Sequence, residues 1–131
     1  MAASATRIVL IALCLGCAPA GVCSNPPVPD CTGTPPPDLA TLQATVLGPR
    51  CVVMTACHSF EEHQGGVILA TPEAAASSLA PYVIPGDPRC SDLGFRVTTD
   101  EPLLRMPPAN RLSAAERCAV LAWIRDGAPG L

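Results

Sequence analysis

The segment Leu112–Ala128 reads LSAAERCAVLAWIRDGA, and this stretch decides the fold class. Ser113 and Glu116 stand three positions apart and form the capping box that begins a helix. Arg125 suits the carboxyl end of the helix dipole, and Gly127 suits the stop. One face carries Val120, Leu121 and Ile124, with Trp123 flanking it. Since no stretch of the chain has convincing strand alternation, the sequence predicts an all-α fold.

Upstream of this helix, two further helices are predicted from their caps. Asp38 caps the first, which carries apolar residues along one face and is expected to end at Gly48-Pro49. Thr71-Pro72-Glu73 supplies the cap, first-turn proline and early acid of the second, which is rich in alanine and ends near Pro81. The apolar face of the first helix comprises Leu39, Leu42, Val46 and Leu47.

A fourth, shorter helix is expected after the turn Pro85-Gly86-Asp87-Pro88. Asp87 is the expected cap, with Pro88 at the first helical position. The helix should run through Leu93 and be closed by Gly94, because glycine is a common terminator.

The amino terminus has the three-part layout of a signal peptide, assigned to residues 1–20. Arg7 precedes an apolar run from Ile8 to Leu15, which is too short to span a membrane. Two cleavage sites compete: one before Cys17, similar to a bacterial lipoprotein box, and one after Ala18-Pro19-Ala20. Lipidation of Cys17 is favoured, so the sequence predicts an exported, periplasmic or otherwise extracytoplasmic protein tethered to a membrane.

Residues 21–37 are rich in proline and predict a stiff spacer before a folded domain at 38–128. The chain carries 8 Arg plus Lys against 11 Asp plus Glu, and it contains no Lys. Neither a nucleic-acid patch nor a polybasic membrane patch is therefore expected. No hydrolase or kinase signature is present, which favours a carrier or binding role over an enzyme.

The domain is too small and too poor in large side chains to depend on hydrophobic burial alone. It has only 2 Phe, 1 Trp and 1 Tyr, and such domains usually carry disulfides, a metal or a bulky cofactor. Six cysteines remain after the leader and Cys17, an even number that favours pairing in an exported protein. A disulfide between Cys90 and Cys118 would join two helices, and Cys23 with Cys31 would close a loop in the spacer.

Cys57-His58 is the pair that carries chemistry. A cysteine followed directly by histidine can bond a haem edge while the next side chain supplies an axial nitrogen. The usual attachment pattern is C-x-x-C-H, but here Met54 occupies the nearer position and the other cysteine is Cys51. Attachment through both cysteines then requires a looped-out segment after a non-helical Cys51, and attachment through Cys57 alone is the other option.

Two structural alternatives compete with this interpretation. Cys51 and Cys57 could form a local disulfide, leaving His58 on the surface. Together with His63 the same residues could also be zinc ligands, but adjacent Cys57 and His58 do not match the usual ligand spacing, and exported thiols tend to oxidise.

From Leu39 to Ala128 the chain resembles a small c-type cytochrome domain of exported bacterial proteins. The resemblance rests on the order and spacing of several segments along the chain. These are the Cys51–His58 segment, Gly65–Leu69, Val83–Pro88 with Ser91 and Leu93, Met106-Pro107-Pro108, and the final helix through Gly127-Ala128.

The resemblance implies an all-α domain around one covalent haem c, with Cys51 and Cys57 as its thioether residues. His58 would be the proximal iron ligand and Met106 the distal one, positioned by the prolines that follow it. The implied role is one-electron transfer with periplasmic redox proteins. The alternative is a haem-free, disulfide-stapled binding domain. The scarcity of large side chains favours the haem, because the porphyrin would supply the missing apolar bulk.

Overall fold

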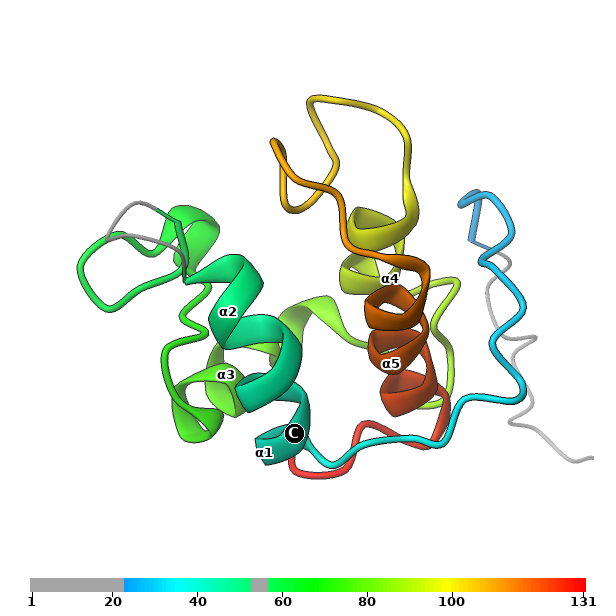
Figure 1. Cartoon of the computed structure of the whole chain (residues 1–131), viewed down its shortest axis with the longest axis horizontal. Coiled ribbons are helices and arrows are strands. Elements are labelled where there is room, and N and C mark those ends of the chain that lie inside the picture. The colour runs from blue at the N-terminus through cyan, green and yellow to red at the C-terminus, as the bar shows by residue number, and fades with distance from the viewer. Residues whose placement is uncertain (1–22, 53–56) are drawn as a thin grey trace, which may run out of the picture.

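The computed structural model describes residues 23–52 and 57–131, and these residues form a small helical domain (Figure 1). The predicted signal peptide, the cleavage sites, Cys17 and Met54 lie outside the described residues. Within the described ranges there is no strand, and the all-α prediction is confirmed. None of the helices in that part of the chain is long and apolar enough to cross a membrane. The helices are α1 (Leu39–Leu42), α2 (Gly48–Cys51), α3 (Pro72–Leu79), α4 (Asp92–Thr98) and α5 (Ala114–Arg125).

The first predicted helix does not end at Gly48-Pro49, and that prediction was wrong. A π-helical turn at Gln43–Leu47 joins α1 to α2, so the chain stays helical up to Cys51. The Gly48 amide donates to the Gln43 carbonyl, five residues back. Pro49 has no N–H to place in this ladder, and the wider π turn accommodates its ring. Cys51 is consequently the last residue of α2 rather than part of a loop.

The boundaries predicted for the fourth helix were also wrong. Asp87 shapes a turn, because its Oδ1 accepts from the Cys90 amide at 2.9 Å, and α4 begins only after Ser91. Gly94 lies inside α4. A Cβ built there would sit 2.0 Å from the Pro88 carbonyl oxygen, so this glycine allows the turn to pack against the helix.

The caps of α3 and α5 match the prediction. Thr71 accepts from the Ala74 amide at 3.2 Å, and Ser113 and Glu116 form the reciprocal capping box. Gly127 has a φ of +93°, the left-handed conformation expected just past a helix end. Trp123, expected to flank the apolar face of α5, is completely buried, and its Nε1 donates to the Pro129 carbonyl at 3.1 Å.

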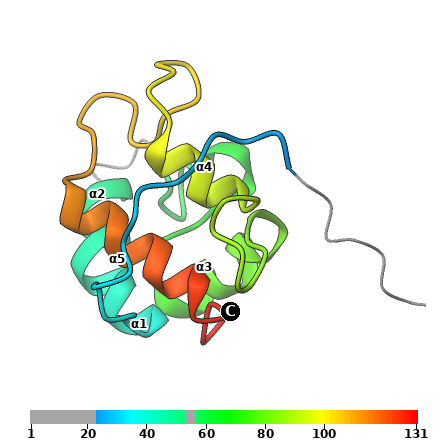
Figure 2. The same cartoon turned by 90° about the vertical axis from the view of Figure 1, so that its right-hand side faces the viewer.

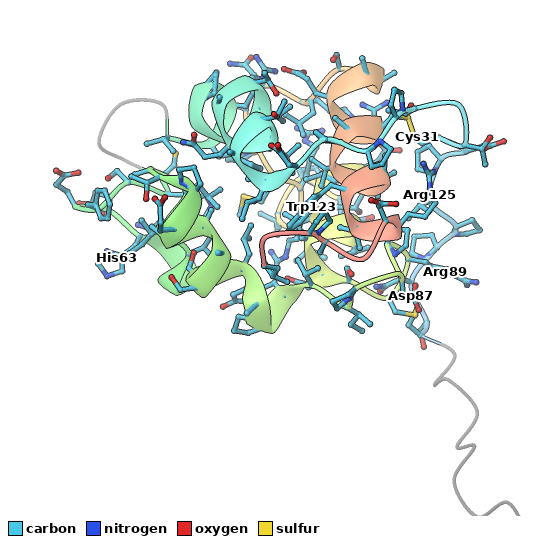
Figure 3. The ribbon with its side chains drawn as sticks, turned by 90° about the horizontal axis from the view of Figure 1, so that it is seen from below. Cys31, His63, Asp87, Arg89, Trp123 and Arg125 are labelled. Carbon is cyan, nitrogen blue, oxygen red and sulfur yellow. A yellow bond between two sulfur atoms is a disulfide. The ribbon has the colours of Figure 1, made fainter. Side chains whose placement is uncertain are left out.

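The core lies between α1, α3 and α5, around Trp123 (Figure 3). The carboxyl-terminal residues turn back beside α1. The largest fully buried side chains are Trp123, Leu42, Leu47, Leu79, Leu112, Leu121, Ile124 and Val120. Most of the buried bulk is therefore leucine, isoleucine and valine around one indole.

The proline-rich segment at 23–37 lies against the domain, passing along α4 and α5 (Figure 2). Arg125 of α5 donates to the carbonyls of Cys31 and Thr34 at 3.0 and 3.2 Å. Asn25 and Arg89 exchange side-chain to carbonyl hydrogen bonds at 3.1 and 2.9 Å. These contacts hold the segment as a strap on the outside of the two helices.

Two disulfides fasten this strap, and the predicted pairings were wrong. Cys23 is bonded to Cys90, and Cys31 is bonded to Cys118. The sequence-based pairs treated the proline-rich segment as a free spacer. Because it packs on the domain, its two cysteines come to lie beside the α4 turn and α5 instead of beside each other.

Candidate functional site

A cavity of about 510 Å³ opens between α2, α4, the loop at 57–69 and the loop at 99–112. All four residues predicted to hold the cofactor line it: Cys51, Cys57, His58 and Met106. They come from three separate places in the sequence, and folding brings them to one cavity. Its apolar wall includes Leu47, Leu69, Leu79, Leu93, Val97 and Leu112. A cavity of this size and character suits a large, mostly apolar ligand.

The imidazole of His58 is oriented by a backbone carbonyl. Its Nδ1 lies 3.1 Å from the Val67 carbonyl oxygen. A carbonyl only accepts hydrogen bonds, so in the neutral ring Nδ1 is the protonated nitrogen and Nε2 keeps its lone pair. A histidine that binds a metal through one ring nitrogen almost always donates the other N–H in this manner. The geometry therefore leaves the Nε2 nitrogen of His58 available for a metal.

The carbonyl that orients His58 belongs to a segment that is itself held in place. The Ser78 hydroxyl of α3 bonds both the amide and the carbonyl of Ile68, at 3.0 and 2.9 Å. Gln43 donates to the carbonyls of Leu69 and Ala70, each at 3.1 Å. The extended residues after the Gly65-Gly66 turn thus form a fixed wall beside the histidine.

Cys51 and His58 are joined through the backbone. The His58 amide donates to the Cys51 carbonyl at 3.1 Å. In a helical C-x-x-C-H segment the histidine follows the first cysteine by four positions and makes this same bond. Here it follows by seven, so three extra residues are accommodated without moving Cys51 away from the histidine. The non-helical Cys51 of the prediction was wrong, and the predicted looped-out segment falls at residues 53–56, outside the described residues.

The thiols of Cys51 and Cys57 are both free, so the alternative of a local disulfide between them is not the arrangement in this structure. Burial raises the pKa of the Cys51 thiol from an ordinary value of 9.0 to about 12, and the nearby Cys57 contributes further. Burial acts this way because the thiolate loses its hydration. Cys51 is accordingly a neutral thiol at physiological pH.

We expect alkylation of Cys51 by iodoacetamide in haem-free protein to be very slow at pH 7 and to rise about tenfold per pH unit towards pH 12, since the thiolate is the nucleophile. In urea the profile should instead level off near pH 9. Because the folded pKa is raised, the associated stability is present below pH 9 and declines as the pH rises towards 12. Mass spectrometry of the Cys51 peptide measures the rate. Fast alkylation of Cys51 at pH 7 would contradict the raised pKa of its thiol.

Met106 lies on the wall of the cavity, in the loop between α4 and α5. Figure 1 shows this loop extending away from the ends of the two helices. Its amide donates to the carbonyl of Arg96 at 2.8 Å, which joins this loop to α4. Pro107 and Pro108 line the cavity beside it. The thioether is a soft ligand suited to iron.

Sequence reasoning missed five polar residues of the cavity: Arg50, Gln64, Tyr82, Asp92 and Arg96. Tyr82 donates to the Gly65 carbonyl at 2.8 Å, and Arg96 pairs with Asp92 at 3.2 Å. The position of Arg50, directly before Cys51, was the one available signal in the sequence.

His63 does not line the cavity and projects outward from its loop (Figure 3). Its Nδ1 lies 3.3 Å from the Phe60 carbonyl. Among residues 23–52 and 57–131 no group of three or more His, Cys, Asp or Glu side chains is placed to hold a metal ion.

The fold and cavity define a class: a small helical domain with one histidine, one methionine and two thiols around an apolar pocket. A family model described as Planctomycete cytochrome C matches residues 55–110. No curated protein and no solved structure matches the chain. The match supports a cytochrome c-like domain and, at a coarse level, haem binding with electron transfer. The matched residues include Cys57, His58 and Met106 but not Cys51.

The residues of the cavity fit a haem. The walls are apolar, His58 leaves Nε2 available, and a thioether and two free thiols share the same space. When bound, the haem iron supplies a one-electron couple.

Proposed function

We propose that this protein is an electron carrier with one covalent haem c, held by Cys51 and Cys57 and ligated by His58 and Met106. The observation that carries the proposal is the His58 ring, whose Nδ1–H is committed to the Val67 carbonyl. That bond leaves Nε2 for a metal in the same cavity as Met106 and the two thiols.

Each group has a distinct part in holding the cofactor. The thiols of Cys51 and Cys57 would each add S–H across a vinyl group, sulfur to one carbon and hydrogen to the other, without an oxidant. His58 would give the iron a basic nitrogen made more electron-rich by the Val67 carbonyl. The thioether of Met106 would favour the ferrous state and so raise the reduction potential.

If His58 and Met106 both ligated the iron, no position would remain there for a substrate, so the proposed role is electron transfer rather than catalysis. We further propose an extracytoplasmic location, a lipid anchor at Cys17, and periplasmic redox proteins as donor and acceptor. The absence of Lys argues against docking through a ring of lysines.

The test is a visible spectrum of protein exported together with the bacterial cytochrome-maturation machinery. We expect a sharp reduced α-band, and haem staining that survives a denaturing gel. Met106→Ala should alter the axial-ligand spectrum and lower the potential while the haem stain persists. A colourless protein of unmodified mass would refute the proposal.

One observation favours a second candidate, a haem-free binding domain. Two disulfides fasten the strap to the domain, which is the stapling expected of such a domain. In that case the apolar cavity would receive another ligand, and the colourless outcome above would identify this alternative.

A further inference from the structure

We infer that Arg50 is a positioning residue that fastens the Met106 loop, residues 99–112, to the helix that ends at Cys51. The inference rests on the proposed function, because it concerns how Met106 is held near the iron. Arg50 lines the cavity, and its side chain is 33% exposed.

The guanidinium of Arg50 connects three elements. Its Nη2 donates to the carbonyls of Asn110 and Arg111 at 3.3 and 3.0 Å, at the end of the loop. Its Nε lies 3.2 Å from Glu116 Oε1 in the first turn of α5, without hydrogen-bond geometry. One side chain from α2 thereby contacts the end of the loop and the start of the following helix.

The other polar contacts of the Met106 loop lead elsewhere. The Met106 amide and the Leu104 carbonyl bond Arg96 of α4, and Arg111 bonds Asp100 and the Thr98 carbonyl. Arg117 of α5 donates to the Leu112 carbonyl at 2.7 Å. These contacts hold the loop to itself, to α4 and, at its last residue, to α5. Arg50 is the residue of α2 that reaches it, and α2 also carries Cys51.

Apolar burial contributes little to holding the tip of this loop. Leu103 is 94% exposed and Leu104 is 39% exposed. A segment with few buried apolar contacts opens at low free-energy cost, so the polar contacts at its ends decide how often it opens. Each opening would withdraw the Met106 thioether, a neutral ligand, from the cavity.

The experiment measures imidazole binding to the ferric holoprotein. Imidazole enters only when Met106 is displaced, so its apparent affinity follows the open fraction. A hydrogen bond from a charged group contributes about 1.5–3 kcal/mol, so Arg50→Gln should bind imidazole about tenfold to a hundredfold more tightly. The sulfur-to-iron charge-transfer band should weaken in parallel. Arg89→Gln, which removes an arginine-to-carbonyl bond outside the cavity, is the matched control and should leave both readouts unchanged.

Glu116→Gln is the second variant. Glutamine can still accept from the Ser113 amide, so the capping box of α5 survives while the charge facing Arg50 is lost. A few-fold rise in imidazole affinity is expected. If Arg50→Gln binds imidazole as the unmodified protein does, while Met106→Ala binds it much more tightly, the inference is wrong and the proposed ligand set stands.

If Met106→Ala also leaves imidazole binding unchanged, or if the protein holds no haem, the proposed ligand set fails instead. Amide hydrogen exchange then still tests the fastening. The amides of Leu104, Arg105 and Met106 are hydrogen-bonded and should exchange about tenfold faster in Arg50→Gln. Unchanged exchange at these three amides would overturn the inference.

Discussion

The Cys51→Ala, Cys57→Ala double variant is expected to lose all haem that survives denaturation, whereas each single variant keeps one thioether. The reason is the bond from the His58 amide to the Cys51 carbonyl, which keeps both cysteines beside the histidine despite their wider spacing. The number of thioethers is measured from the α-band of the pyridine haemochrome. Each vinyl group that forms no thioether stays conjugated with the porphyrin and moves this band to longer wavelength.

The two single variants separate the models of attachment. If the Cys51→Ala band stays where the unmodified protein has it, only Cys57 is attached, and the three extra residues prevent the second bond. A double variant that still stains for haem on a denaturing gel would refute covalent attachment at these cysteines. His63→Ala is the control, since its side chain lies outside the cavity and should change neither the stain nor the band.

The Cys31→Ser, Cys118→Ser variant is expected to lose about 2–5 kcal/mol of unfolding free energy, a typical cost for a small exported domain. This disulfide spans 87 residues, so its loss gives the unfolded chain a large increase in freedom. It also frees the strap from α5, where Cys31 is only 5% exposed. Urea unfolding of the haem-free protein, monitored by Trp123 fluorescence, measures the change.

The comparison variant is Cys23→Ser with Cys90→Ser. That disulfide spans 67 residues and holds only the outer end of the strap, so a smaller loss is expected. The loss of unfolding free energy on removing both disulfides should approach the whole stability of a domain of this size. An unchanged urea midpoint for the Cys31–Cys118 variant would show that the strap contributes nothing to stability.

The candidate ligands could be chosen from the sequence because they are residue types in a recognisable order. Cys57-His58 and Met106-Pro107-Pro108 were identified without coordinates, and folding places both segments on one cavity. Arg50 was not identified, because its partners are the backbone carbonyls of Asn110 and Arg111. Backbone carbonyls have no sequence signature, so only the fold reveals such a contact.

Local hydrogen bonding explains which helices the sequence determined. The caps at Thr71 and Ser113 use side chains that bond amides three residues away, so the sequence alone contains the whole interaction. By contrast, Gly94 was taken as a helix stop because glycine often has that role. The structure uses it instead for the close approach of the Pro88 carbonyl, a contact that depends on how a turn folds back.

By itself, then, the sequence determined the helical class, the caps of α3 and α5, and the candidate ligands, all of which depend on neighbours along the chain. The tertiary structure decided the disulfide partners, the helical state of Cys51 and the contact from Arg50 to the Met106 loop. These depend on which distant segments meet. Cys31 pairs with Cys118 only because the strap packs along α5, and packing of that kind sums many weak contacts between remote residues.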